Sequence, residues 1–393
     1  MEQCSELRNS MANFSSIQAS AVVPINGSEC SRTRTGFEEL VAHRTRPPFA
    51  FAAQENGVVL SVNEKAGTMI IKYKTGEKVC VDFGEQYSNN SSNGFFVTQD
   101  VVLNGYKKGD TFKKGDILAY NRQFFQADPW DKSTVRYRLG VQAHVAILDN
   151  GGTIEDASIL TQPLCDRMVF NPTHEVEIVL STDTNIRSYV KLGNEVNSTE
   201  PLLVWDESAF DEGNEEDPEL VKMLQKLNTT SKRAGHTGTV VDIKVLYKSP
   251  LSAMTNSMRN FIKYATEKKN LQAAQAAGCI NEDDHLASMP LTSTTKVGTV
   301  LLEPETVIIR FYIRQTKSMS AGDKLFFDSS LKSVCSQVYP DYIEVEDGSI
   351  KVEAASSARG ILARLITSPF LSGITNLCLE KLESEILDIW DSK

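Results

Sequence analysis

The chain has 393 residues, of which 41% are hydrophobic and 23% charged, a composition typical of a soluble globular protein with room for two or three domains. Its net charge of −10 counts against a free-standing nucleic-acid-binding protein. The longest apolar runs are far shorter than the ~18 residues of a membrane-spanning helix, and the N-terminus lacks the basic-then-apolar pattern of a secretory signal. Seven cysteines without any CxxC pair argue against a disulfide framework and against a zinc cluster.

One acidic run dominates the charge. Eight acidic residues and no basic one lie in WDESAFDEGNEEDPEL (205–220), as is typical of a solvated loop. The rest of the chain is close to neutral, so a local basic site is compatible with the composition.

Short segments with β character dominate the chain. Branched apolar residues alternate with polar ones over residues 57–83, and KAG and TGE turns divide this stretch into a predicted meander. Gly-Asp follows lysine twice in GYKKGDTFKKGDILA (105–119), a pattern that favours tight turns between short strands. Residues 168–197 and 238–247 have the same alternating character, so we expect further strands there.

The clearest predicted helix covers residues 249–278. Ser252 is a candidate N-cap, helix-forming residues follow it, and Gly278 is a candidate stop. Apolar residues recur at helical spacing, which predicts a packing face formed by Met254, Met258, Phe261, Ile262 and Ala265.

A second helix is predicted near the end of the sequence, over residues 375–390. Its apolar residues, three or four positions apart, are Leu379, Leu382, Ile386 and Ile389. This pattern is compatible with docking on the chain's own domain and with docking on another chain. Together the elements predict a mainly β fold with some α-helix, in which a mixed α/β excursion from about 165 to 300 interrupts a β-barrel core.

Two lysines lie eight positions apart in MSAGDKLFFDSSLKSV (319–334). If this stretch folds back as a hairpin about Asp328, Lys324 and Lys332 face each other, and directly opposed like charges ~5 Å apart destabilise a strand pair. Such a pair is tolerable when an anion lies between the ammonium groups, and lysine suits phosphate oxygens. The alternative is a pair of exposed loop lysines without a ligand.

Three further charged residues are candidates for chemistry. Glu155 and Asp156 follow a glycine-rich turn, where adjacent acids fit the start of a helix because its dipole favours negative charge. They also fit a pair beside a divalent metal, since hard cations take oxygen ligands. Arg364 follows a stretch of small residues within 354–369, and an exposed arginine is its simplest interpretation.

Taken in order, these stretches resemble one family, the second-largest (β) subunit of multisubunit DNA-directed RNA polymerase, in its C-terminal half. In GDKLFFDSSLKS (322–333), Lys324 and Lys332 keep the spacing of that family's two lysines after GDK. The family's Arg-His-Gly bend and its neighbouring glycines are missing here. The preceding TVIIRFYIRQTKSMSA (306–321) resembles the strand that leads into the family's GDK.

Other segments resemble the same family in the same order. Glu155 and Asp156 fall on the Glu-Asp of its Leu-Gly-x-Asn…Glu-Asp-Ala run, although Ile-Leu-Asp replaces its Met-Pro-Trp. Gly360 and Arg364 are four apart, as in its Gly-Val-Pro-Ser-Arg, but without the Pro. The remaining similar stretches are TRTGFEELVAH (33–43), KKGDTFKKGDILA (107–119), YVKLGNEVNSTEPLLV (189–204) and SKRAGHTGTVVDIKVLY (231–247).

The resemblance implies a double-psi β-barrel core with a flap- or wall-like insert and discontinuous domains. The first part of the core would cover residues 1–164, with a sandwich-like meander at 57–104, and the second part residues 301–370. The insert would cover 165–300 with the acidic loop and the long helix, and the terminal helix in 371–393 would contact another subunit. A chain of this extent resembles the gene-split β subunits of jumbo bacteriophages.

The resemblance also implies a nucleotidyltransferase subunit that is active only in a complex. Lys324 and Lys332 would contact phosphates of the RNA 3′ end and of the incoming nucleotide, and Arg364 would take the triphosphate through a bidentate fork. Asp156, helped by Glu155, would lie near the second Mg²⁺, while a β′-like partner chain holds most of the Mg²⁺ coordination.

The implied partners are an N-terminal β-like chain, β′-like chains, a promoter-specificity subunit, template DNA, nascent RNA and nucleoside triphosphates, and no membrane. The implied location is the cytoplasm of an infected host cell or a virion. An alternative from another class is a β-barrel phage structural or assembly protein without catalysis. It would use the acidic loop and the terminal helix as interaction surfaces.

Overall fold

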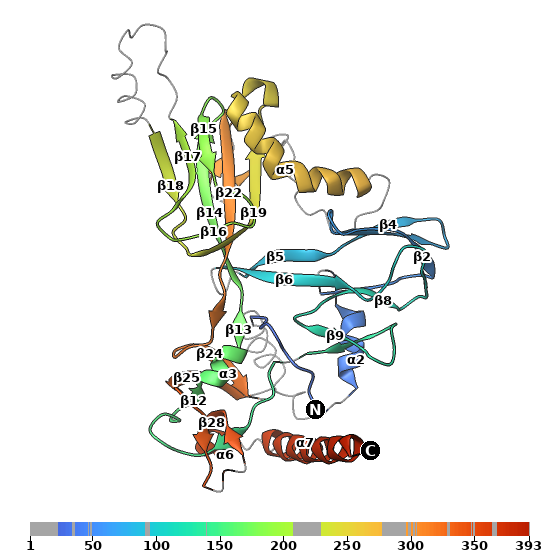
Figure 1. Cartoon of the computed structure of the whole chain (residues 1–393), viewed down its shortest axis with the longest axis vertical. Helices are drawn as coiled ribbons and strands as arrows, with labels where there is room; N and C mark the ends of the chain where they lie inside the picture. Colours follow the sequence, from blue (N-terminus) through green and yellow to red (C-terminus); the bar gives the residue numbers. More distant parts are fainter. Residues whose placement is uncertain are drawn as a thin grey trace.

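The computed structural model describes residues 23–33, 36–45, 47, 49–90, 95–138, 140–206, 229–276, 296–297, 300–301, 303, 305–327, 331–346, 348, 350–363 and 368–392. Strands dominate these residues, which confirms the mainly β class that the alternating pattern predicts (Figure 1). None of the described helices is both long and apolar enough to cross a membrane.

The largest sheet runs through the middle of the molecule (Figure 1) and has eight strands. Seven of them follow the order β1-β8-β6-β14-β22-β19-β16, and β5 pairs with β6. Their bounds are β1 (Ala50–Ala52), β5 (Gly84–Asn90), β6 (Phe95–Leu103), β8 (Ile117–Asn121), β14 (Pro172–Ser181), β16 (Glu195–Val196), β19 (Gly238–Tyr247) and β22 (Thr306–Arg314). β22 lies between β14 and β19 and buries apolar side chains on both faces, as a central strand requires.

A three-stranded sheet and the long helix α5 (Asn256–Ala276) lie beside the β14, β22 and β19 part of the large sheet (Figure 1). The small sheet consists of β15 (Asn185–Tyr189), β17 (Pro201–Asp206) and β18 (Thr229–Arg233). The five residues predicted as a packing face are all buried in the core cluster that these elements share: Met258, Phe261, Ile262 and Ala265 on α5, and Met254 just before it. The prediction of a packing face is therefore confirmed.

The predicted N-cap of this helix is wrong by three residues. Ser252 lies within a short 3₁₀ turn, η2 (Leu251–Ala253), and α5 begins at Asn256. Thr255 caps the helix instead, because its Oγ1 accepts a hydrogen bond from the Met258 N–H at 3.3 Å. The same hydroxyl donates to the Thr184 carbonyl at 2.8 Å, so a tertiary contact fixes the cap. The predicted stop, Gly278, lies outside the described residues.

The meander predicted over residues 57–83 is present. Its strands β2 (Gly57–Asn63), β3 (Thr68–Tyr73) and β4 (Lys78–Asp82) pair antiparallel, and β7 (Thr111–Phe112) extends the sheet beyond β2. The two Lys-Lys-Gly-Asp turns around β7 form as the sequence predicts. Asp110 and Asp116 each accept a backbone hydrogen bond from the residue three positions earlier, at 2.8 Å in both turns.

A five-stranded sheet in the lower part of Figure 1 carries the candidate site. It consists of β11 (Val145–Ile147), β12 (Ala157–Thr161), β24 (Lys324–Phe327), β25 (Leu331–Tyr339) and β28 (Ala354–Ser356), in the order β11-β28-β12-β25-β24. β12 pairs parallel with β25 and antiparallel with β28, and β11 pairs parallel with β28. The strands therefore join two segments of the chain that the whole insert region separates in sequence. Helices α3 (Gln162–Arg167) and α6 (Ala358–Ala363) follow β12 and β28 directly.

The remaining strands form two-stranded sheets: β9 (Phe125–Ala127) with β10 (Val135–Tyr137), β13 (Val169–Phe170) with β23 (Lys317–Ser318), β20 (Lys296–Val297) with β21 (Val300–Leu301), and β26 (Ile343–Glu344) with β27 (Lys351–Val352). Helix α2 (Phe37–Arg44) contacts β1, β8 and β10.

The predicted C-terminal helix is present as α7 (Ser368–Asp391) and begins earlier than predicted. It contacts its own chain through polar groups: Arg32 pairs with Glu383, Thr33 bonds Asn376, and His144 bonds Glu380. Its apolar face is exposed at Leu371, Ile374, Leu382, Ile386 and Ile389. The helix therefore lies on its own chain while leaving its apolar face uncovered by the described residues.

Candidate functional site

The two candidate lysines lie on one hairpin, formed by β24 and β25. The alternation of the sequence explains its orientation: Leu325, Ser333 and Cys335 point inward and are buried, while Lys324 and Lys332 share the exposed face. The inner side chains rest on a core cluster that includes Leu160 and Leu164.

The register of the hairpin differs from the prediction. Lys324 is paired with Val334 and Phe326 with Lys332, so the turn is centred one residue beyond Asp328. The two lysines are diagonal neighbours on the exposed face and not directly opposed partners. Diagonal neighbours are about 7–8 Å apart, which weakens their repulsion relative to an opposed pair. Asp328 itself lies outside the described residues.

Glu155 and Asp156 form a tight turn that leads into β12. Both have left-handed backbone angles, with φ of 53° and 65°, so the interpretation of this acidic pair as a helix start is wrong. Such angles are unfavourable for residues with a Cβ and persist where surrounding contacts hold them. Here the Asp156 carbonyl accepts hydrogen bonds from the Val334 N–H at 3.0 Å and from the Ser333 hydroxyl at 2.6 Å.

Serine side chains connect the turn before β12 to β25. The Ser336 hydroxyl donates to the Gly152 carbonyl at 2.5 Å and lies 3.0 Å from the Ser158 carbonyl. The buried Ser158 and Ser333 hydroxyls bond each other. The backbone of the acidic turn is therefore fixed relative to the lysine hairpin.

A third connection reaches helix α6. The Ser357 hydroxyl donates to the Asp149 carboxylate at 2.9 Å, and the Arg359 guanidinium lies 3.2 Å from the same carboxylate. The hydrogen bond from Ser357, with the nearby Arg359 charge, lowers the pKa of the exposed Asp149 carboxyl below its usual value. Ser357 also accepts from the Gly360 N–H at 3.3 Å, which caps α6.

Two residues of this network, Asp149 and Ser357, are not among the predicted site residues. Ser357 stands directly before the 358–363 stretch, and a serine at that place is an N-cap signal. Asp149 belongs to the Ile-Leu-Asp segment, which departs from the family pattern. Its contact with Ser357 joins residues 208 positions apart, which no local signal predicts.

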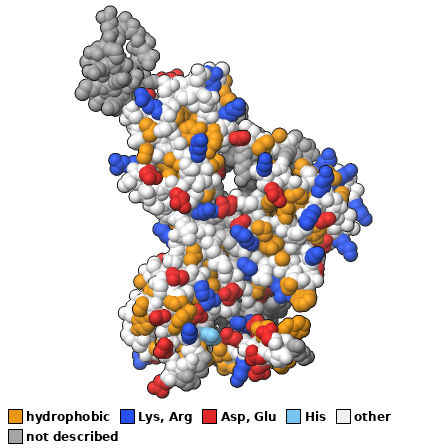
Figure 2. All heavy atoms as spheres, in the orientation of Figure 1, with side chains coloured by type: hydrophobic (Ala, Val, Ile, Leu, Met, Phe, Trp, Pro, Cys, Tyr) orange, Lys and Arg blue, Asp and Glu red, His pale blue; other side chains and the backbone are white. Residues whose placement is uncertain are grey.

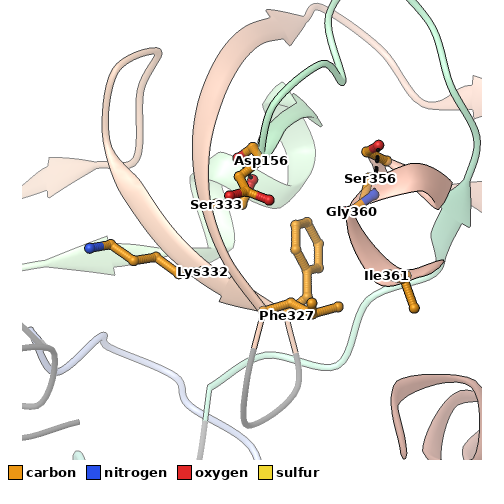
Figure 3. A pocket seen from close by; sticks show the side chains of 9 residues that line it. Asp156, Phe327, Lys332, Ser333, Ser356, Gly360 and Ile361 are labelled. Carbon is orange, nitrogen blue, oxygen red and sulfur yellow. Dashed lines mark hydrogen bonds between the residues drawn. The ribbon is translucent and has the colours of Figure 1, made fainter. Parts of the chain in front are cut away.

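A small cavity lies between these elements (Figure 3). Asp156, Ser333 and Gly360 line it, and the Phe327 ring points into it. Its volume of about 10 Å³ leaves space for roughly one water molecule. The Lys332 side chain starts at its rim but points away from it (Figure 3), consistent with its place on the exposed face of β25.

The structure thus brings four of the five predicted site residues onto adjoining elements. Lys324 and Lys332 lie on the exposed face of the hairpin, whereas Asp156 lies on the other side of β25, with Glu155 exposed beside it. Arg364 lies outside the described residues, directly after the end of α6 at Ala363.

Within the part of the chain that the structure describes, no cluster of three His, Cys, Asp or Glu side chains could hold a metal ion. Asp156 and Glu155 can supply carboxylate oxygens, the ligand type that Mg²⁺ prefers, but only as a minority of its ligands. The described residues therefore do not form a self-contained metal centre, and these two carboxylates could supply only part of a coordination shell.

Comparison of the sequence with protein-family models and with curated proteins finds no match.

Proposed function

We propose that this chain is the C-terminal part of a gene-split β subunit of a multisubunit DNA-directed RNA polymerase, of the jumbo-bacteriophage type. The observation that carries the proposal is the junction between β12 and β25. There, Ser333 of the lysine hairpin donates to the carbonyl of Asp156, 177 positions away. The segments that resemble the family's Glu-Asp and two-lysine motifs are thus direct neighbours.

The strand pairing supports the proposal that the core is a discontinuous double-psi β-barrel. Two parallel pairs, β12 with β25 and β11 with β28, interlock with the antiparallel pair of β12 and β28. A crossed arrangement of this kind is compatible with a discontinuous double-psi β-barrel. In this proposal, the core comprises residues 1–164 and 301–370, and the flap- or wall-like insert comprises 165–300.

The proposed chemistry is the electrostatic part of nucleotidyl transfer. Phosphoryl transfer depends mainly on positioning and charge neutralisation. Lys324 and Lys332 bind phosphates of the RNA 3′ end and of the nucleoside triphosphate, and their common exposed face lets both reach one polyanionic ligand. Arg364 adds a bidentate contact to the triphosphate. Phosphate contacts carry no base information, so template pairing selects the nucleotide.

Mg²⁺ would neutralise charge on the attacking and leaving oxygens when bound. Asp156, with Glu155, would contribute carboxylate oxygens to a bound Mg²⁺, and a β′-like chain would supply most of the other ligands. The chain is therefore inactive alone and requires the N-terminal β-like and β′-like chains, with a specificity subunit for promoters.

The proposal is tested in the reconstituted complex with Lys324→Ala and Lys332→Ala. Each variant should reduce RNA extension by about 100-fold or more, as expected for loss of a group that stabilises transition-state charge. Assembly of the complex should survive, because both side chains are exposed. Lys191→Ala, an equally exposed lysine in the insert, is the matched control. Normal extension by both hairpin variants would refute the proposed role.

A second candidate function has one observation in its favour. The uncovered apolar face of α7 suits a β-barrel structural or assembly protein without catalysis. Purification from infected cells separates the two: the polymerase requires several large partner chains, one with an aspartate triad. A homo-oligomer without such chains would favour the structural protein.

A further inference from the structure

A second pair of lysines lies face to face on a different sheet. In the β3–β4 hairpin, Lys72 is directly opposite Lys78, and both side chains are exposed. Directly opposed residues have Cβ atoms about 5 Å apart, where like charges destabilise a strand pair. The meander thus contains the opposed arrangement that the sequence predicted for Lys324 and Lys332.

Three more lysines lie next to this pair. The Lys74 N–H donates to the Asn56 carbonyl at 2.9 Å, and the Lys114 N–H donates to the Asn56 side chain at 2.7 Å. Asn56 therefore holds the β3–β4 turn beside the turn that follows β7. We name the resulting group the distal lysine surface; its members, all exposed, are Lys72, Lys74, Lys78, Lys113 and Lys114. Figure 2 shows Lys and Arg side chains gathered where Figure 1 draws β2 and β4.

The local charge opposes that of the whole chain. Residues 72–78 and 111–116 contain five lysines and two acids, in a protein with a net charge of −10. One of the acids, Asp116, already accepts hydrogen bonds from the Lys113 N–H at 2.8 Å and the Tyr106 hydroxyl at 3.1 Å. Among the described residues, none of the five lysines forms an ion pair. Their charge is thus available to an external anion.

The side chains around the lysines indicate whether the anion is an acidic protein or a nucleic acid. Residues 55–82 and 105–119, all of them described, include no large exposed hydrophobic side chain. Protein interfaces depend on buried apolar or aromatic anchors, whereas a phosphodiester chain binds through charge alone. We infer that the distal lysine surface binds the phosphodiester backbone of nucleic acid, without reading its sequence. This contact lies outside the proposed active centre, on a sheet that contains neither Lys324 nor Lys332.

The inference is tested by fluorescence anisotropy with the full chain and a labelled mixed-sequence single-stranded oligonucleotide, between about 50 and 200 mM salt. The Lys72→Gln/Lys78→Gln double variant should bind about 5- to 10-fold more weakly at the lowest salt. Its plot of log affinity against log salt should flatten by about 1.4, the contribution of two phosphate contacts to a single strand. Lys191→Gln/Lys232→Gln, two exposed lysines elsewhere, is the control of equal charge.

Each result has a defined meaning. An effect confined to the Lys72/Lys78 variant, with an unchanged far-UV circular dichroism spectrum, supports the inference. Equal weakening by the control, or no weakening by the test variant, overturns it. Binding to a labelled poly-glutamate peptide without binding to the oligonucleotide also overturns it, in favour of an acidic protein partner. Normal RNA extension by Lys324→Ala and Lys332→Ala would count against the active-centre proposal alone, whereas unchanged oligonucleotide binding by the Lys72/Lys78 variant would count against this inference alone.

Discussion

The β3–β4 and β24–β25 hairpins each present two lysines to solvent, and they differ in register. Lys72 and Lys78 are directly opposed, whereas Lys324 and Lys332 are diagonal. The offset of two positions in the pairing of Lys324 and Lys332 places their ammonium groups farther apart and weakens their repulsion. Lysine spacing in the sequence alone therefore does not determine the distance between the charges.

The two hairpins also differ in what supports them. The inner face of β24 and β25 contacts a small core cluster, and Ser333 bonds the acidic turn at Asp156. The inner face of β3 contacts a larger cluster that includes Met69 and Ile71. One hairpin is thus hydrogen-bonded to the turn that carries Glu155 and Asp156, while the other carries directly opposed lysines over a larger apolar cluster. This difference fits the two proposed roles, chemistry at one hairpin and binding at the other.

The largest expected effect comes from removing the apolar support under each hairpin. Ile71→Ala and Leu325→Ala each delete a buried side chain and should lower the free energy of unfolding by about 2–4 kcal/mol. Urea denaturation followed by circular dichroism measures this loss. Only Leu325→Ala should also reduce RNA extension in the reconstituted complex at a temperature where both variants are folded. Equal extension by the two variants would remove the functional distinction between the hairpins.

A smaller effect is expected at the serine link. Ser333→Ala removes the bond to the Asp156 carbonyl and leaves the buried Ser158 hydroxyl without this partner, at a cost of about 1–2 kcal/mol. Because the acidic turn then loses part of its support, the Mg²⁺ concentration for half-maximal extension should rise. Ser257→Ala is the matched control, since it also removes a hydroxyl that forms a hydrogen bond, with the Ile186 N–H at 3.0 Å, but lies on α5 and not at the acidic turn. The same Mg²⁺ dependence in both variants would argue against a role for the turn in metal binding.

The sequence predicts the strands and helix faces that depend on near neighbours, but not the contacts between residues far apart in the chain. Alternation and turn residues predicted the meander at 57–83, and helical spacing predicted the buried face of α5, because both depend on neighbours within a few positions. The N-cap of α5 is Thr255 and not the predicted Ser252, because the Thr255 hydroxyl also donates to the Thr184 carbonyl in the adjoining loop.

The same division applies to the candidate site. Glu155 and Asp156 could be picked out as an acidic pair, but their left-handed backbone depends on contacts with β25, far along the chain. A hairpin centred on Asp328 and the observed one differ by two positions in the partner of Lys324, and the sequence around Asp328 favours neither. The opposition of Lys72 and Lys78 depends on the exact pairing of β3 with β4, which lysine spacing does not determine.

The smallest expected effect tests the registers directly. In a double-mutant cycle, Lys72→Gln and Lys78→Gln should reveal a repulsive coupling of about 0.2–1 kcal/mol, because these charges are opposed. The corresponding cycle with Lys324→Gln and Lys332→Gln should give a smaller coupling, because these lysines are diagonal. Amide hydrogen exchange of each hairpin measures the local opening free energy that the cycles require.

Salt provides the internal control for these cycles. The Debye length falls from about 10 Å at 0.1 M to about 3 Å at 1 M salt, so the Lys72–Lys78 coupling should largely disappear at the higher concentration. A coupling that persists in 1 M salt would come from packing and not from charge. A larger coupling at Lys324 and Lys332 than at Lys72 and Lys78 would contradict both registers. If the predicted order holds, the β3–β4 hairpin retains its two lysines at a cost to its own stability, which is the behaviour expected of a surface whose charge is used in binding.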